Sequence, residues 1–524
     1  MAVVAGAAAL VLVSGGSETD PRTPAGVPGL PPPFLGTAVV GGGGLTAAVD
    51  AYGNVVDLRA PGPAGRALIE IPAERQAAGT VAADSGIVPR ARIGGRWLPF
   101  WRADAVTQRY RAGTNVVATA ARFGPHRVAV VYAATSGRLG CLVRSSGPRV
   151  AIGVEEPDLH TRVRCDDGVA RRIVRGSARA DRRWLARARP LRADAPIWAR
   201  QLYRRSLLTL RALTDRRTGA AAAGARDGWA YVWPRDAGTA ALALAAAGYR
   251  SEARRIAGFL LTLDLGTAAR FHGDGTPVPG RDAQGDAAGW VAVAARAAGA
   301  DGPKTHLHRG KSAHRPAVLP WRDRADYQER DAGTYLGNAI AAGATGEPPA
   351  DGPETSPWRT FPAHRPPIEG EFGTSRGLVR RAGDPGSGLD SAAAWVVRPF
   401  PRPALFAAAR RTLLRLADKQ TPFGIAPGED WPGTDPWTAP TAWTAWSLAA
   451  LGERRAALRL LAALRRASTP AGALPERVDA QTGIPASTTP LAWPHAFAIL
   501  GLRELWPNRG PAKPPLDFGR PQGD

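Results

Sequence analysis

Residues 441–467 read TAWTAWSLAALGERRAALRLLAALRRA, and this stretch decides the fold of the second half of the chain. Apolar residues recur every three or four positions on both sides of Gly452, which is the spacing of two amphipathic helices joined by a tight turn. The same pattern returns repeatedly between residues 193 and 507, with glycine or proline at the helix ends. We therefore predict about ten to twelve helices there, paired as hairpins in a barrel or a solenoid.

Residues 34–192 show a different pattern. Short β-rich runs, such as residues 35–58 and 106–123, alternate with glycine and proline. Runs of this length and spacing predict an antiparallel β-sandwich. Cys141 and Cys165 both lie in this region. They could form a disulfide in an exported protein, and two buried free thiols are the alternative.

The two ends of the chain differ from the parts between them. Residues 1–16 read MAVVAGAAALVLVSGG, an apolar run shorter than the ~20 residues of a membrane span. We expect a signal-like segment or a short, weak membrane anchor, with a Pro/Gly-rich linker to residue 33 and an exported protein. The proline-rich, polar residues 508–524 predict a loose tail.

The formal net charge of +23 raises the question of nucleic-acid binding. Only four of the 68 basic residues are lysine, and the arginines are scattered along the helices. A phosphate-binding surface normally uses both residue types, so we expect a basic, monomeric enzyme and no nucleic-acid partner. The histidines at positions 306, 308 and 314 have no carboxylate or cysteine at ligand spacing. We interpret their segment as a solvated loop and predict no metal site.

Loops between the predicted helices combine tryptophan with charged or amide side chains. A pyranose binds through apolar ring faces and through forked donors or acceptors for its hydroxyl pairs, so this mixture is typical of a sugar site. Helix capping and dipole effects explain such acids equally well when each cluster is taken alone. The candidate residues are Trp233, Arg235 and Asp236; Gln284 and Asp286; Glu329; Asp430 and Trp437; Glu476; and Trp493.

The order and the sequences of these clusters resemble those of glycoside hydrolase family 15, which contains glucoamylases, glucodextranases and related bacterial trehalases. The strongest resemblance lies in EDWPGTDPWTAPTAW at 429–443 and GALPERVDAQTGIPASTTPLAWPHAF at 472–497, with the family's "LPE" and "PLAWSHA" signatures. Residues 226–236, RDGWAYVWPRD, are similar to the family's "YxYxWxRD". The resemblance implies a β-sandwich followed by an all-α (α/α)6 barrel catalytic domain.

The resemblance also implies roles for individual residues. Glu476 matches the general base that activates the attacking water, and Glu329 corresponds to an acid of the family's "DLWEE" segment, so we assign it as the general acid. Arg235 and Asp236 match a pair that holds sugar hydroxyls. The implied reaction is the inverting, exo-acting hydrolysis of an α-glucoside in an oligosaccharide or polysaccharide, without a metal or organic cofactor. Trp233 and Trp437 match walls of the same pocket.

A saccharide-binding protein without hydrolytic activity is the alternative. In the segment that contains Glu329, Gln328 stands where the family has tryptophan, and Arg330 stands where it has a second glutamate. A shift of the alignment by one residue would leave no proton donor. The sequence therefore leaves both an α-glucosidase and a binding protein open.

Overall fold

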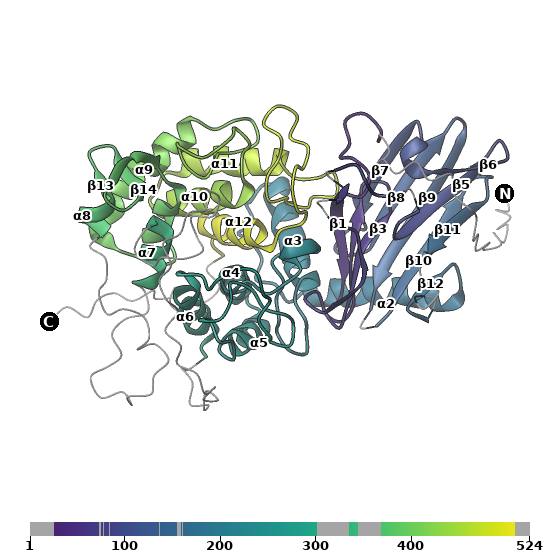
Figure 1. Cartoon of the computed structure of the whole chain (residues 1–524), viewed down its shortest axis with the longest axis horizontal. Coiled ribbons are helices and arrows are strands. Elements are labelled where there is room, and N and C mark those ends of the chain that lie inside the picture. The colour runs from purple at the N-terminus through teal and green to yellow at the C-terminus, as the bar shows by residue number, and fades with distance from the viewer. Residues whose placement is uncertain are drawn as a thin grey trace.

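The molecule consists of a β-rich part and a helical part that lie side by side along its long axis (Figure 1). The computed structural model describes residues 26–72, 75–76, 78–82, 84–135, 137–154, 159, 161–300, 335–343 and 368–508. Strands β1 to β12 and helix α2 form the first part, and helices α3 to α12 with strands β13 to β15 form the second. The predicted change from strands to helices along the chain is confirmed.

Two sheets form the β-sandwich. The larger sheet has the order β1-β2-β3-β5-β11, with β4 paired to β3 and β6 paired to β5. The smaller sheet has the order β12-β10-β9-β8-β7. Neighbouring strands are antiparallel except for β10 and β12. The strands are β1 Gly36–Gly41, β2 Thr46–Asp50, β3 Val55–Ala60, β4 Arg66–Glu70, β5 Ile87–Ile93, β6 Arg96–Pro99, β7 Ala105–Tyr110, β8 Val117–Phe123, β9 His126–Ala134, β10 Leu139–Ser145, β11 Val150–Val154 and β12 Val163–Cys165.

Cys141 and Cys165 form a disulfide between β10 and β12. The two residues are directly paired in the parallel register of these strands, with their Cα atoms 4.6 Å apart. The disulfide therefore joins the edge strand β12 to the smaller sheet. Of the two alternatives that the sequence left open, the structure contains the bridge.

A helix that the strand-rich pattern did not predict follows β12. Helix α2, Gly168–Leu185, begins at Asp167, whose side chain accepts a hydrogen bond from the backbone N–H of Ala170 at 2.6 Å. Its apolar face packs on β9 and β10 through Ile173 and Val174. Six of its residues are arginines, and they lie opposite an apolar stripe of helical spacing, so the helix was missed although its sequence shows the pattern of a surface helix.

The helical part has an inner and an outer set of helices. Nearly every residue of α4, α10 and α12 is buried, whereas α5 and α11 bury only one face. A helix that is apolar all round belongs inside, and an amphipathic helix belongs at the surface. The helices are α3 Ile197–Ala212, α4 Pro234–Ala246, α5 Arg250–Leu260, α6 Ala287–Ala298, α7 Leu336–Ala342, α8 Ile368–Phe372, α9 Phe406–Asp418, α10 Thr438–Ala450, α11 Arg454–Arg466 and α12 Ala492–Leu505.

Tryptophans fill the space between the inner helices. Trp395 contacts Trp290 and Trp443 edge-on, with ring centroids 5.1 and 5.4 Å away. Trp443 continues this chain of rings to Trp493, at 4.8 Å. Edge-to-face aromatic pairs stabilise a core beyond the burial of their apolar area. The tryptophan cluster therefore fixes how α6, α10 and α12 are spaced around the centre of the helical part.

Residues 373–389 form a small sheet within the helical part, which the sequence analysis did not predict. Strands β13 Gly373–Thr374, β14 Gly377–Arg381 and β15 Asp384–Leu389 pair in that order. The segment is rich in glycine and arginine, so it lacks the alternation of apolar and polar residues that predicts strands. Across the ranges the structure describes, no helix combines the length and apolar character needed to cross a membrane. The N-terminal segment and residues 509–524 lie outside the described residues.

The two parts share a continuous buried interface. Every residue of β1 is buried, because the strand lies between the rest of the sandwich and α3. Gly41 allows the close approach, since a Cβ at this position would lie 2.9 Å from the carbonyl oxygen of Ala212. Thr46 donates to the same carbonyl, and Asn115 donates to the carbonyl of Leu208 at 2.9 Å.

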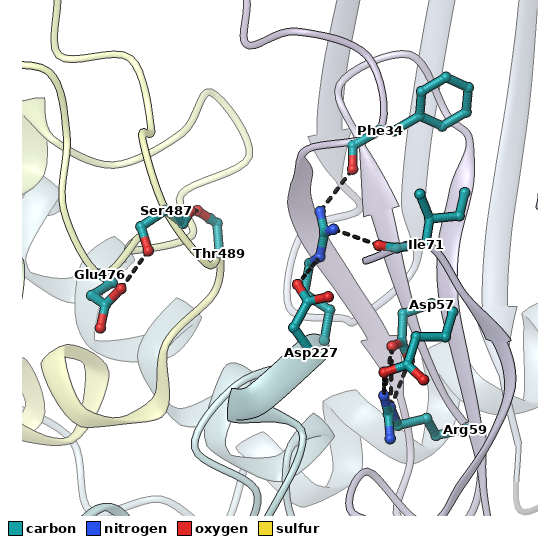
Figure 2. A network of polar contacts seen from close by, with 10 residues as sticks. Phe34, Asp57, Arg59, Ile71, Asp227, Glu476, Ser487 and Thr489 are labelled. Carbon is teal, nitrogen blue, oxygen red and sulfur yellow. Dashed lines mark hydrogen bonds and ion pairs between the residues drawn. The ribbon is translucent and has the colours of Figure 1, made fainter. Parts of the chain in front are cut away.

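Arg226 is the polar centre of this interface, and Figure 2 shows its contacts. Its guanidinium donates to the carbonyl oxygens of Phe34 and Ile71, at 2.7 and 2.6 Å, and to the carboxylate of Asp227 at 2.6 Å. The side chain is 1% exposed. A buried guanidinium is stable only when its donors are satisfied, so this one arginine holds two segments of the sandwich against the helical part.

We predict that Arg226→Met lowers the free energy of unfolding by about 3 kcal/mol or more, because it leaves two buried carbonyls and a carboxylate without their donor. Chemical unfolding followed by fluorescence measures this loss. Arg204→Met, at an exposed position of α3, is the control and should change the stability by less than about 0.5 kcal/mol. Equal stability of the two variants would show that Arg226 does not hold the interface.

Candidate active site

A cavity of about 380 Å³ lies where the N-terminal ends of three inner helices meet. Trp233, Trp437 and Leu491 are the residues that precede the first turns of α4, α10 and α12, and all three line the cavity. Helix N-termini carry partial positive charge and free backbone N–H groups, so they favour carboxylates and polar ligands nearby. The convergence of the three helix N-termini therefore favours polar or negatively charged groups at this end of the helical part.

Glu476 enters the cavity from the loop between α11 and α12. The loop is fixed on both sides of the residue: its N–H donates to Thr488 at 2.9 Å, and its carbonyl accepts from the N–H of Thr438 at 3.0 Å. The hydroxyl of Ser487 donates to a carboxylate oxygen of Glu476, as Figure 2 shows. The side chain is half-buried, so its carboxylate is held in place but still reaches the cavity.

His495 holds the same loop from within the core. The backbone N–H of Leu474, two residues before Glu476, donates to Nε2 of His495 at 3.0 Å. Nδ1 lies 2.9 Å from the hydroxyl of Ser206 on α3, and it carries the proton because Nε2 is the acceptor. Burial lowers the pKa of His495 well below its usual value, so the ring stays neutral and keeps this tautomer.

Arg235 is buried at the base of the cavity among acidic and amide groups. Its Nη1 donates to Asp286 at 3.1 Å, and its guanidinium lies 4.5 Å from the centre of the Trp493 ring. With its amide oxygen turned toward the guanidinium, Gln284 accepts from both Nη atoms at 3.1 and 3.3 Å. Gln284 and Asp286 are therefore placed to orient Arg235.

Asp236 is a buried carboxylate that also lines the cavity. Burial raises its pKa from an ordinary value near 3.8 to about 7. The guanidinium of Arg235 opposes this rise, and the charges of Asp286 and Glu476 add to it. Burial likewise raises the pKa of Asp286. The carboxylates of Asp236 and Glu476 that line the pocket can accept hydrogen bonds from the hydroxyl groups of a ligand.

Aromatic rings form the walls of the cavity. Trp233, Trp437, Trp443 and Trp493 all line it, and Trp431 lies 5.3 Å from Trp437 between ring centroids. The indole N–H of Trp233 donates to the carbonyl of Gly228 at 3.0 Å, which fixes the orientation of that ring. Such flat apolar faces beside charged groups match the needs of a sugar ring.

The structure brings together most of the residues that the sequence analysis selected. Trp233, Arg235, Asp236, Trp437, Glu476 and Trp493 line the cavity, and Gln284 and Asp286 lie directly behind Arg235. Asp430 does not line it: its side chain is exposed and its backbone lies against Gly388. Glu329 lies outside the described residues, as do the three histidines of residues 301–334. The residues that the structure does describe contain no group of three or more potential metal ligands.

Several cavity residues were missed at the level of sequence. Ser487 lies eleven residues after Glu476, and nothing in the pattern indicates that its hydroxyl turns back to that carboxylate. Arg270 and Arg281 contact the Trp233 ring, with guanidinium-to-centroid distances of 6.0 and 5.5 Å. They come from the loop between α5 and α6, where scattered arginines resemble those of any exposed loop.

Comparisons with known proteins agree with this geometry. Residues 198–269 match the family model described as glycosyl hydrolases family 15. The crystal structure of a bacterial glucoamylase complexed with acarbose superposes with a TM-score of 0.64 and 12% identity, covering 95% of this chain and 96% of that one.

Two further structures are similar over a shorter length. One described as a wild-type glycosidase has a TM-score of 0.43, 22% identity, and coverage of 59% of this chain and 97% of its own. The glucoamylase from Saccharomycopsis fibuligera has a TM-score of 0.43, 14% identity, and coverage of 60% and 96%. No curated protein matches the sequence.

The matched family segment includes α3, α4 and α5, and therefore the helix start that carries Trp233, Arg235 and Asp236. A β-sandwich followed by a helical barrel, as in the bacterial glucoamylase, accounts for the fold of nearly the whole chain. The fold of the chain is thus similar to that of a bacterial glucoamylase. The match to the model of glycosyl hydrolases family 15 is confined to residues 198–269.

We predict that Asp236→Asn stabilises the protein at pH 8 but not at pH 4. Because burial raises the pKa of Asp236, the folded state favours the protonated form. Protonated Asp236 therefore adds to the free energy of unfolding. This stabilisation is complete below the unfolded-state pKa near 3.8 and is lost as the pH rises through about 7. Asparagine does not ionise, so the variant should melt a few degrees above the wild type at pH 8.

The measurement is Tm at intervals from pH 4 to pH 8. Glu504→Gln, at an exposed position of α12, is the control and should follow the wild type at every pH. A Tm difference between Asp236→Asn and the wild type that stays constant from pH 4 to pH 8 would contradict the raised pKa of Asp236.

Proposed function

We propose that the protein is an inverting, exo-acting α-glucoside hydrolase of the glucoamylase type, in which Glu476 is the general base. The observation that carries the proposal is the position of the Glu476 carboxylate. It faces the same cavity as Arg235 and Asp236, which six tryptophans of the described residues line, and the hydroxyl of Ser487 restrains it. The similar bacterial glucoamylase is complexed with acarbose, which favours a carbohydrate substrate for this chain.

In this proposal Glu476 accepts a proton from the water that attacks the anomeric carbon. A base of this kind must be ionised and within hydrogen-bond reach of the water. The hydroxyl of Ser487 supports this state because it donates to the carboxylate and also fixes which oxygen points toward the cavity. The loop contacts of Thr438 and Thr488 keep the main chain of Glu476 from moving as the proton is transferred.

The general acid of the proposal is Glu329, as the resemblance of its segment to the family implies. Inversion needs room for a water molecule between the sugar and the base, which corresponds to a separation of about 6.5–9.5 Å between the two carboxyl groups. Glu329 would donate its proton to the glycosidic oxygen while the water attacks from the opposite side. The sugar at the chain end would be held by Arg235 and Asp236 against the rings of Trp233 and Trp493.

We predict that Glu476→Gln reduces kcat by about 10²–10⁴-fold on an α-glucoside while the protein remains folded. Glutamine keeps the shape of the side chain and accepts a hydrogen bond from Ser487, but it does not take a proton at neutral pH. The measurement is glucose release from maltose, isomaltose, trehalose and dextrin, with detection of the anomer by NMR.

Glu504→Gln is the matched control, since it makes the same chemical change at the exposed end of α12 and should retain full activity. Inversion of an α-linkage yields β-glucose as the first product. With dextrin as the substrate, α-glucose as the first product cleaved from the chain end by the wild type would refute the inverting mechanism. Full activity of Glu476→Gln would remove this residue from the proposed mechanism.

We predict that Ser487→Ala lowers kcat about tenfold and leaves KM nearly unchanged, because the base loses the donor that orients it. Ser487→Thr retains a hydroxyl at this position and should recover most of the activity. Steady-state kinetics of the two variants on the best substrate provide the test. Equal losses of kcat in both variants would show that the hydroxyl of residue 487 does not orient the base.

The alternative is a family member that binds saccharides without hydrolysing them, as the Gln328 and Arg330 departures would favour. The same assay distinguishes it from the hydrolase. A folded wild-type protein that releases no glucose from any of the four substrates, yet binds one of them in calorimetry, would favour the binding protein over the hydrolase.

A further inference from the structure

A second cavity, of about 400 Å³, lies between the sandwich's helix α2 and helices α3, α4 and α5. Its lining includes residues of all four helices and of the turn that follows α3. It shares no lining residue with the candidate active site. In Figure 1, α2 runs beneath the sheets and leads toward the helical part, so the cavity lies at the junction of the two parts.

Arginine dominates the charge of this junction cavity. Among the described residues, five arginines line it: Arg183 on α2, Arg187 just after α2, Arg211 on α3, Arg216 after α3, and Arg255 on α5. The lining carboxylates are those of Asp215 and Glu252, and Asp181 lies behind Arg211. The arginines thus outnumber the acids that face them.

The two acids that line the junction cavity already form ion pairs or accept hydrogen bonds. Glu252 pairs with Arg187 and accepts from the indole N–H of Trp184 at 2.9 Å. Asp215 accepts two backbone N–H groups of its own turn through one oxygen, from Arg217 at 2.6 Å and Thr218 at 3.2 Å. Within the part of the chain that the structure describes, Arg183, Arg216 and Arg255 form no ion pair with a carboxylate. Three guanidinium groups at the cavity therefore remain available to an anion.

Arg211 shows that this positive charge is built into the fold. The side chain is only 7% exposed, and its Nε lies 3.1 Å from Asp181. Burial lowers the pKa of Arg211, the charge of Asp181 opposes this change, and the nearby charges of Arg216 and Arg187 add to it. A cluster of like charges around a buried guanidinium costs stability unless an anion compensates it.

Aromatic rings hold the arginines in position. Trp184 and Tyr249 are stacked, with centroids 3.9 Å apart and planes at 10°. Arg211 lies over the Trp184 ring at 5.1 Å, and Arg187 lies over the Tyr249 ring at 5.5 Å. The rings therefore fix the orientation of Arg211 and Arg187, whose positive charges lie beside the three arginines that form no ion pair among the described residues.

We propose that the junction cavity is a binding site for a small phosphate-bearing ligand, separate from the sugar pocket. The planar forks of the arginines match the oxygens of a phosphate group in bidentate geometry. A cavity of about 400 Å³ is larger than one phosphate group needs, which fits a diphosphate or a phosphorylated sugar. Because its walls come from both parts of the molecule, the bound ligand stabilises their junction.

The test is calorimetric titration of the full chain at physiological ionic strength with pyrophosphate, glucose 1-phosphate and glucose. We expect one pyrophosphate per chain and a higher Tm in its presence. The double variant Arg183→Gln/Arg216→Gln breaks no ion pair of the described residues, and it should weaken this binding at least about tenfold. Arg255→Gln, on α5, is a second, independent variant with the same expected direction.

The matched control is Arg172→Gln/Arg175→Gln, which removes the same charge from exposed positions of α2 outside the cavity. It should bind pyrophosphate as the wild type does. Tighter binding of glucose 1-phosphate than of pyrophosphate, lost in the first double variant, would identify a sugar phosphate as the ligand. Absence of binding by both phosphate compounds, or an equal loss in the control, would overturn the proposal.

Discussion

The architecture depends on the interaction between Arg226 and the sandwich. One guanidinium, excluded from solvent, supplies the donors for two sandwich carbonyls and for the neighbouring Asp227. Seven residues further along the chain, Trp233 forms the first wall of the sugar pocket. Among the residues that the structure describes, no sandwich side chain lines that pocket, but the sandwich holds the segment that leads into α4. The position of the pocket wall follows from the domain interface.

A second constraint is the convergence of helix starts. The loops that precede α4, α10 and α12 are tied to one another by backbone hydrogen bonds, such as those from Ala492 to Ala223 and from Thr438 to Glu476. A carboxylate on one loop is thus placed relative to an aromatic ring on another with little freedom. Catalysis by positioned groups needs this rigidity, because small displacements of an acid or base are costly in rate.

Much of this could be predicted from the sequence, and the failures have physical causes. The period of the apolar residues separated strands from helices, and the position of Arg235 and Asp236 at a helix start placed them at the pocket. Helix α2 was missed because it directly follows a long run of strands and was included in the predicted sandwich, although its apolar residues have helical spacing. Asp430 was selected for its tryptophan neighbours, yet the direction of a side chain in an irregular loop depends on contacts with distant segments, here Gly388. The junction cavity brings together residues about seventy positions apart, which no local pattern indicates.

Strand β1 has a consequence for the evolution of this architecture. Because the strand is covered on one side by its own sandwich and on the other by α3, both of its faces are apolar or small. A sandwich of this kind is not an accessory module that recombination can transfer between unrelated enzymes. Substitutions along β1 and along the facing side of α3 must compensate one another, so the two surfaces are expected to diverge together among descendants of this gene.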